Sequence, residues 1–194
     1  NLAAAGVKVG SGGQIRVDKH QRTSQPHIWA LGDVSSDRLL KHVANAEART
    51  VAANLLIDGG ELAATDHRYI PHAVFTEPQI AAVGATEEQL QEWGTPYVEF
   101  KQRYADVAFG WALEDEGHFV KLLADPRTWH LLGAHIIGPQ AATLIQPMIQ
   151  AMSFGQTVQE LARGQYWIHP ALTEVLENAL LGLLKAPRPK ELDA

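Results

Sequence analysis

The sequence predicts an α+β fold in which an antiparallel sheet with flanking helices follows a shorter α/β segment. Between residues 69 and 138, short apolar runs succeed one another with only turn residues between them, as consecutive antiparallel strands do. After Pro139 the apolar residues instead recur at three- and four-residue spacing, which is typical of amphipathic helices. Before Ala63 one apolar strand leads into a long alanine-rich helix. We therefore place a domain boundary between Ala63 and Arg68 and predict domains of 1–65 and 66–194.

Composition indicates an ordinary globular protein. Hydrophobic residues make up 46% of the 194 residues, enough to bury a core. Sixteen basic and 22 acidic residues give a net charge of −6, which argues against nucleic acid or an anionic membrane as a partner. There is no apolar run long enough to span a membrane and no signal peptide, so we expect a soluble, cytoplasmic protein. Because the first residue is Asn1 and not Met, we also expect a fragment or a processed product.

The chain contains no cysteine, so it can form no disulfide, no thiolate metal site and no thiol chemistry of its own. Its nine histidines include no His-Glu-x-x-His or similar close set. His67 and His72 are five residues apart, as are His130 and His135. We predict that the chain has no metal site.

The first domain shows two strand patterns, each next to a glycine. We predict a hairpin of strands 7–9 and 15–17 joined by a glycine-rich turn, which is no phosphate loop because it leads into a strand. The apolar run 28–31 predicts a buried parallel strand that ends at Gly32 and Asp33. Glycine permits close approach of a backbone or a ligand, and the adjacent carboxylate can accept hydrogen bonds from sugar hydroxyls.

A long helix is predicted over residues 39–56, where alanine and leucine recur at helical spacing before Asp58-Gly59-Gly60 ends it. Around Leu40, Lys41 and His42, at its start, free backbone amides could meet a polar or anionic group. Neither the strand end nor the helix start identifies a ligand alone.

Several segments of the second domain are predicted as strands. They are Tyr69–Thr76, Ile80–Gly84, Pro96–Tyr104, Val107–Ala112, His118–Ala124 and Leu131–Gly138. Between the second and the third, Thr86-Glu87-Glu88-Gln89 is a capping box that begins a short helix, and Gly94 ends it. The acidic run Glu114-Asp115-Glu116 is interpreted as a solvated loop and not as a metal cluster.

The part of the chain after Pro139 is predicted to be helical. One helix face comprises Ala142, Ile145, Ile149 and Met152. Pro147 lies inside that run and should kink or break the helix. A second capping box at Thr157-Val158-Gln159-Glu160 begins a short helix that ends at Gly164.

The run that begins at His169 carries the candidate catalytic residues. Pro170 fits the first turn of a helix, so we predict a helix start there with His169 at the cap. The apolar stripe of this helix comprises Leu172, Val175, Leu176, Ala179, Leu180 and Leu183. Glu174 can reach back to one ring nitrogen of His169 and leave the other free, as in a general acid/base with an orienting carboxylate. The alternative is a histidine that only caps the helix. Tyr166 and Trp167 could line a substrate cleft beside His169, but aromatic residues just before a helix more often pack, so they are interpreted as packing residues.

Two motifs resemble those of a known family. The run His-Pro-Ala-Leu-Thr-Glu at 169–174 is similar to the His-Pro-x-x-x-Glu signature of the flavin-dependent pyridine nucleotide-disulfide oxidoreductases, the family of glutathione reductase, dihydrolipoamide dehydrogenase and mercuric reductase. The run Ile-Trp-Ala-Leu-Gly-Asp-Val at 28–34, followed by a long helix, resembles the second flavin motif of that family. The resemblance implies that 1–65 is the C-terminal part of an FAD-binding domain and that 66–194 is the interface, or dimerisation, domain.

The resemblance also implies roles for single residues. Gly32 and Asp33 would bind the ribityl or sugar hydroxyls of FAD, and Leu40, Lys41 and His42 would lie by the pyrimidine edge of the flavin. In a homodimer, His169 would be the acid/base and Glu174 would hold its ring, acting at the flavin and cysteines of the partner subunit.

The activity implied is reduction of a small-molecule disulfide with NADPH through FAD. This chain lacks the redox cysteines and a nicotinamide domain, so we expect it to be inactive alone. Two alternatives stay open, another disulfide or mercuric reductase of the family and a catalytically silent dimerisation module.

Overall fold

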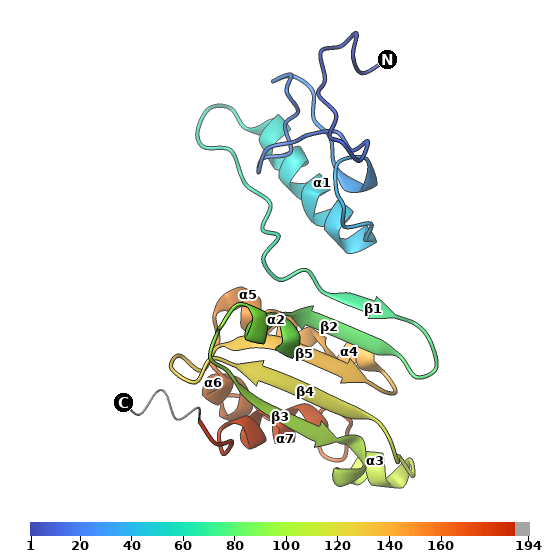
Figure 1. Cartoon of the computed structure of the whole chain (residues 1–194), viewed down its shortest axis with the longest axis vertical. Coiled ribbons are helices and arrows are strands. Elements are labelled where there is room, and N and C mark those ends of the chain that lie inside the picture. Colours follow the sequence, from blue (N-terminus) through green and yellow to red (C-terminus); the bar gives the residue numbers. More distant parts are fainter. Residues whose placement is uncertain (189–194) are drawn as a thin grey trace. The chain divides into compact units, whose positions relative to one another are not determined.

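The computed structural model describes residues 1–188 and divides into two compact units (Figure 1). Unit 1 is Asn1–His67, and unit 2 begins at Arg68. Within the described residues, no helix has the length and apolar character needed to cross a membrane. The Glu77–Pro78 and His169–Pro170 peptide bonds are cis.

Unit 1 is built around one long helix. The helix predicted over 39–56 is confirmed as α1, Lys41–Leu56, and the short 3-10 helix η1, Gly32–Val34, contacts it. The predicted hairpin is too long, because only one isolated bridge joins Val9 to Ile15. Its turn is present, since the Gly10 amide donates to the Gln14 carbonyl at 2.8 Å.

The prediction of a buried parallel strand over 28–31 is wrong. Trp29 forms only an isolated antiparallel bridge with Arg22, and Ala30 is the one buried residue of the run. A parallel strand needs neighbours that take up its backbone hydrogen-bonding groups. No strand among residues 1–188 supplies them, so the run is an extended segment held by single bonds such as that from the Ala30 amide to the Gln21 carbonyl, 3.1 Å.

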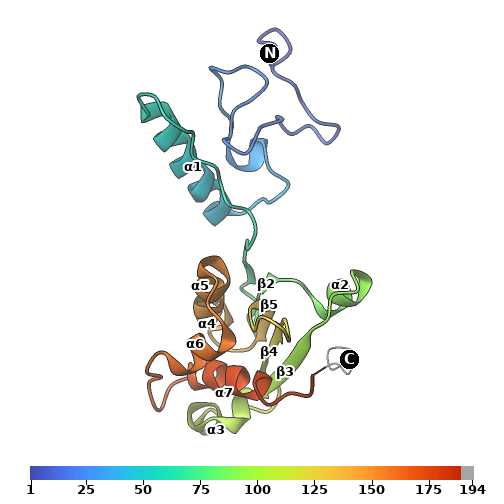
Figure 2. The same cartoon turned by 90° about the vertical axis from the view of Figure 1, so that its left-hand side faces the viewer.

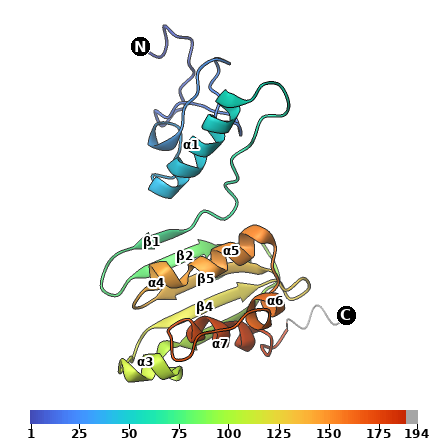
Figure 3. The ribbon, with the colours of Figure 1, turned by 180° about the vertical axis from the view of Figure 1, so that it is seen from behind.

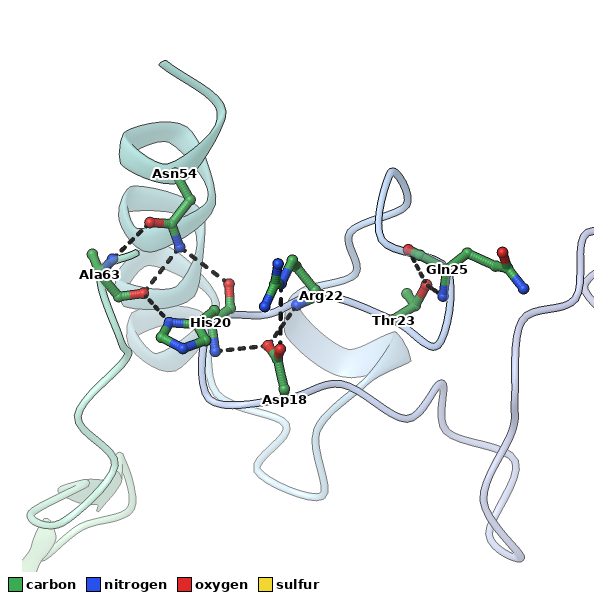
Figure 4. A network of polar contacts seen from close by, with 7 residues as sticks. All are labelled: Asp18, His20, Arg22, Thr23, Gln25, Asn54 and Ala63. Atoms are coloured by element: carbon green, nitrogen blue, oxygen red, sulfur yellow. Dashed lines mark hydrogen bonds and ion pairs between the residues drawn. The ribbon is translucent and has the colours of Figure 1, made fainter. Parts of the chain in front are cut away.

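The Asn54 side chain fastens the end of unit 1 to α1. It accepts a hydrogen bond from the Ala63 amide at 2.8 Å and donates to the Ala63 carbonyl at 2.9 Å. The same carbonyl accepts from His20 Nδ1 at 2.9 Å, and Asp18 accepts from the His20 amide at 2.8 Å (Figure 4). Three segments of unit 1 are thereby joined at one point.

Two further contacts continue this fastening along α1, and we call the three together the polar ladder. Its pairs are Asn54–Ala63, Thr50–Thr65 and Glu47–His67. The Thr65 hydroxyl donates to the Thr50 hydroxyl at 2.9 Å, and His67 Nε2 lies 3.0 Å from Glu47 Oε1. The helix residues of these pairs are three or four positions apart, so they share one face of α1. Their partners are two positions apart, as are residues on one side of an extended segment.

Unit 2 contains a five-stranded antiparallel sheet in the order β1-β2-β5-β4-β3 (Figure 1). Its strands are β1 His72–Val74, β2 Ile80–Gly84, β3 Val98–Arg103, β4 Phe119–Ala124 and β5 Leu131–Ile137. In the centre, Val120 and Leu122 of β4 pair with Ile136 and Ala134 of β5, and all four side chains are buried. The predicted fold class, an antiparallel sheet with flanking helices, is confirmed.

The segment 107–112 was predicted as a strand, and that prediction is wrong. After the 3-10 helix η2, Tyr104–Asp106, it forms the short helix α3, Ala108–Ala112. Its buried positions are Val107 and Gly110, three residues apart as on a helix. A Cβ at Gly110 would lie 1.9 Å from the Tyr104 carbonyl oxygen, so a close backbone contact at this glycine accompanies the helical turn.

Two predicted capping boxes are confirmed. Thr86 caps α2, Glu87–Glu92, and accepts from the Gln89 amide at 3.2 Å while Gln89 Oε1 accepts from the Thr86 amide at 2.9 Å. Thr157 caps α6, Val158–Arg163, in the same way, and Gly164 follows that helix.

Four helices cover one face of the sheet, and α2 lies on the other side (Figures 2 and 3). They are α4 Ala141–Leu144, α5 Gln146–Phe154, α6 and α7 Glu174–Leu183. The break predicted at Pro147 is confirmed, because α4 ends at Leu144 and α5 begins at Gln146, which places Pro147 in the first turn of α5. Of the face predicted for this region, Ile145 and Met152 are buried and Ala142 and Ile149 only partly so. The predicted apolar stripe is buried, although its first residue, Leu172, precedes α7, and α7 contacts β3 and β4 to form the core.

Candidate active site

The helix after His169 begins later than predicted. Pro170 is not its first residue, because α7 starts at Glu174 with Thr173 as the N-cap. Residues 171–173 form tight turns instead, in which the Glu174 amide donates to the Ala171 carbonyl at 3.2 Å. The Ala171 amide is taken up by Glu174 Oε2 at 3.2 Å, so a side chain holds this segment outside the helix.

The structure brings His169 and Glu174 into direct contact. His169 Nδ1 lies 2.7 Å from Glu174 Oε1, while Glu174 Oε2 holds the Ala171 amide. The His169 side chain is 69% exposed and that of Glu174 only 18%. An ionised carboxylate can only accept, so Nδ1 carries the proton and Nε2 is its unprotonated nitrogen in the neutral ring. Within residues 1–188, His169 Nε2 has no hydrogen-bond partner, and the ring can therefore pass a proton to or from an external group.

The pKa of Glu174 lies below its usual value of 4.5, because the hydrogen bonds from His169 and Ala171 favour the carboxylate, although partial burial opposes them. Its folded-state pKa is thus depressed. The ionised carboxylate stabilises the folded chain above the unfolded-state pKa, and this contribution is lost as the pH falls through the folded-state value.

We expect His169→Ala to raise the pKa of Glu174, because the largest of its stabilising hydrogen bonds is removed. The measurement is a pH titration of the carboxyl carbons by NMR on the 13C-labelled chain. Glu160 is the internal control, since its pKa is lowered by Thr157 and should not change. An unchanged pKa of Glu174 would mean that the bond to His169 is not formed in solution.

The aromatic residues before His169 differ from one another. Trp167 packs against the core, and its indole N–H donates to the Ala162 carbonyl at 3.1 Å, so its interpretation as a packing residue is confirmed. Tyr166 is fully exposed, which makes the same interpretation wrong for it, and Ile168 is 74% exposed. Large apolar groups therefore face outward on both sides of Trp167.

The candidate flavin residues lie together in unit 1. Gly32, with φ of 70°, begins η1, and a Cβ on it would lie 3.3 Å from the Ala44 Cβ of α1. Only glycine combines this backbone conformation with so close an approach. The Gly32 carbonyl accepts from the Ser35 and Ser36 amides at 2.9 and 3.0 Å, and Asp33 is exposed beside it.

The start of α1 supplies the other candidates. Leu40 is its N-cap and has no side-chain capping bond, which leaves the positive end of the helix to other partners. Lys41 and His42 are exposed, and Lys41 Nζ donates to Asn45 Oδ1 at 2.8 Å. Gly32 and Asp33 thus share unit 1 with Leu40, Lys41 and His42, whereas His169 and Glu174 belong to unit 2.

Sequence reasoning missed Glu47. Its carboxylate is 2% exposed and accepts from the Gly32 amide at 2.6 Å. The available signal was a glutamate between two alanines, four residues after Val43 and four before Val51, which are buried on the same face of the helix. In the described part of the chain, no three His, Cys, Asp or Glu side chains gather as a metal site would require.

Two family models match the chain. The pyridine nucleotide-disulphide oxidoreductase dimerisation domain matches residues 70–180, more than half of the chain. The chain belongs to the pyridine nucleotide-disulphide oxidoreductase family. The model for the pyridine nucleotide-disulphide oxidoreductases themselves matches residues 1–50. The resemblance inferred from the two motifs is confirmed, and members of this family use FAD and NAD(P)H.

Curated members of the family are similar along most of the chain. Mycothione reductase of Mycobacterium tuberculosis is 60% identical over 182 residues, which are 92% of this chain and 39% of that protein. Dihydrolipoyl dehydrogenase of Mycobacterium bovis is 36% identical over 183 residues, 94% of this chain and 39% of the relative. The chain therefore spans about two fifths of the length of the curated relatives it matches.

Solved structures share the fold. LpdA from Mycobacterium tuberculosis matches with a TM-score of 0.85 and 27% identity, over 93% of this chain and 39% of that one. The HOCl-induced flavoprotein disulfide reductase RclA from Escherichia coli matches with a TM-score of 0.84 and 27% identity, over 93% of this chain and 41% of its own.

Proposed function

We propose that this chain is the C-terminal region of an NADPH-dependent FAD disulfide reductase that reduces mycothiol disulfide. The observation that carries the proposal is the His169–Glu174 pair, joined at 2.7 Å, in a chain 60% identical to mycothione reductase. Residues 1–65 complete the FAD-binding domain, and residues 66–194 are the interface domain. The chain alone is inactive, because it contains no cysteine to exchange electrons with a disulfide.

The residues of unit 1 fit FAD. A glycine turn with a positive φ, an exposed carboxylate and an uncapped helix start lie next to one another. Asp33 accepts hydrogen bonds from the ribityl or sugar hydroxyls, and Gly32 lets the backbone approach them. The helix start formed by Leu40, Lys41 and His42 would hold the pyrimidine edge of the flavin. Bound FAD supplies the hydride acceptor for NADPH.

His169 moves the proton in thiol–disulfide exchange. Its Nε2 takes the proton of the attacking thiol, whose sulfur then bonds to one sulfur of the substrate while the substrate S–S bond breaks. The leaving thiolate takes that proton back from the imidazolium. Glu174 holds Nδ1–H throughout, so it fixes the tautomer and stabilises the charged ring.

The cysteines and the flavin that His169 serves belong to the partner subunit of a homodimer, which forms through unit 2. Apolar side chains that unit 2 exposes support an association surface. Those nearest to His169 in sequence are Tyr166 and Ile168, both exposed. Tyr166 and Ile168 lie beside His169 in sequence, so a second surface would complete the site where the acid/base is most exposed.

A second candidate substrate is dihydrolipoamide, which the 36% identity to dihydrolipoyl dehydrogenase favours. A silent dimerisation module is favoured less. Association needs only an apolar helix face, so it does not explain the hydrogen bond between His169 and Glu174.

Steady-state oxidation of NADPH by the full-length protein separates the substrates. We expect kcat/KM for mycothiol disulfide to exceed that for lipoamide and for glutathione disulfide by at least about tenfold, which is a difference of about 1.4 kcal/mol in transition-state binding. A preference for lipoamide would overturn the substrate assignment and leave the family unaffected. If no disulfide is turned over, the proposed enzymatic activity is overturned and the dimerisation module is favoured.

A further inference from the structure

Glu47 carries a carboxylate that is almost completely buried in the middle of α1. Its relative exposure is 2%, and its helix neighbours on the same face are Val43, Thr50 and Val51. Burial of a charged group is costly unless each oxygen finds a hydrogen-bond donor. Both oxygens of Glu47 have one, so this residue is held by specific partners and not by apolar packing alone.

The two partners come from different segments of unit 1. Oε2 accepts from the backbone amide of Gly32 at 2.6 Å, 15 residues earlier in the chain. Oε1 lies 3.0 Å from Nε2 of His67, 20 residues later and the last residue of the unit. One carboxylate therefore joins η1, α1 and the end of the unit.

The amide that Glu47 holds belongs to the turn that presents Asp33. The Gly32 carbonyl is fixed by the amides of Ser35 and Ser36, and the Gly32 amide by Glu47, so both sides of the glycine are bonded. Asp33 follows directly and is exposed. Because Gly32 itself has no side chain to lock its conformation, the direction of the next residue depends on these bonds, and the bond to Glu47 is the one that a side-chain substitution can remove.

The rest of the polar ladder does not reach this turn. Thr50 bonds to Thr65 and Asn54 bonds to Ala63, both in the last segment, and Asn54 also bonds to the carbonyl of His20, so none of these partners belongs to η1. Thr50 is therefore a matched control: it is a ladder residue three positions along the same helix face, without a bond to η1 among the described residues.

We infer that Glu47 is a positioning residue for FAD, which acts by fixing the Gly32 amide and thereby the Asp33 carboxylate. The inference rests on the proposed function, since it needs Asp33 to bind FAD hydroxyls.

The test measures the dissociation constant of FAD for the full-length apoprotein, by the change in flavin fluorescence on binding, together with amide hydrogen exchange at Gly32. Glu47→Leu removes both bonds, and Glu47→Asp keeps the charge but is one methylene too short to reach both partners. We expect both variants to raise the dissociation constant, Glu47→Leu by about ten- to a hundredfold, the range for one hydrogen bond to a charged group. Exchange at Gly32 should become faster in both.

The controls separate this inference from the proposed function. Thr50→Val should leave FAD binding within about threefold and Gly32 exchange unchanged. Glu47→Gln retains an oxygen that accepts from Gly32 and should bind FAD nearly as well as the wild type. Asp33→Ala should weaken FAD binding whether Glu47 is native or substituted.

Each other outcome overturns something specific. Normal FAD affinity in Asp33→Ala overturns the role proposed for Asp33. Weak binding in Asp33→Ala with normal binding in Glu47→Asp overturns the positioning role alone. Equal losses in Thr50→Val and Glu47→Leu also overturn it, because the ladder would then act only through the stability of unit 1. If Glu47→Leu does not fold, the decision rests on Glu47→Asp and on the rescue by Glu47→Gln.

Discussion

His169→Ala lowers kcat of the full-length protein for disulfide reduction by about two to four orders of magnitude, the range for loss of a general acid/base. The attacking thiol then loses its proton acceptor, and the leaving thiolate loses its proton donor. The ring is 69% exposed and its Nδ1 is bonded to Glu174, so among residues 1–188 its Nε2 is left to act on an external group. Stopped-flow and steady-state assays of NADPH oxidation give the rates.

Two variants show whether the loss is chemical. His130→Ala removes another exposed histidine of unit 2, one that bonds the Gly155 carbonyl at 3.2 Å, and should leave kcat unchanged. Glu174→Gln keeps the shape of the carboxylate and removes its charge, so kcat should fall less than in His169→Ala, because the base stays but its imidazolium is less stabilised. A normal rate in His169→Ala would remove this residue from the mechanism and leave unit 2 as an association module.

The His169–Glu174 contact could be predicted because both residues lie in one short stretch of chain, where spacing limits the geometry. The start of α7 could not, although it lies in the same stretch. A proline is compatible with a first helical turn, but here Glu174 takes the Ala171 amide with its side chain and keeps residues 171–173 in turns. Competition between a side chain and the helix for one amide is invisible in a pattern of residue types.

Non-local partners explain the other failures. Residues 28–31 have the composition of a buried strand, but a strand exists only where neighbours pair with it, and among residues 1–188 none does. Glu47 was overlooked because its two partners lie 15 and 20 residues away. Residues 107–112 were misassigned because their helix accompanies a contact between Gly110 and the Tyr104 carbonyl, and the alternation of apolar residues carries no information about it.

Leu176→Ala should lower the free energy of unfolding of unit 2 by about 2–5 kcal/mol, the cost of truncating a fully buried leucine. Leu176 has no exposed surface, and neither have Val175, Ala179 and Leu180 around it on α7. The helix packs closely on the sheet, since a Cβ on Gly182 would lie 2.2 Å from the Phe100 ring of β3. With the backbones already so close, the surroundings can move little to fill the space that Leu176 leaves, and the cost should lie toward the upper end of that range.

Urea unfolding followed by tryptophan fluorescence measures this effect, because Trp129 and Trp167 pack against the same core. Leu113→Ala is the matched control, since that side chain is 49% exposed and its loss should cost less than about 1 kcal/mol. A change below about 1 kcal/mol in Leu176→Ala would mean that α7 does not pack on the sheet as described.

Leu176→Ala and His169→Ala should have opposite effects on stability and activity. Leu176→Ala lowers stability while the folded enzyme keeps its kcat, and His169→Ala lowers kcat with little change in stability. That contrast follows from where the side chains lie, since Leu176 contacts the core and His169 projects from the turn before α7.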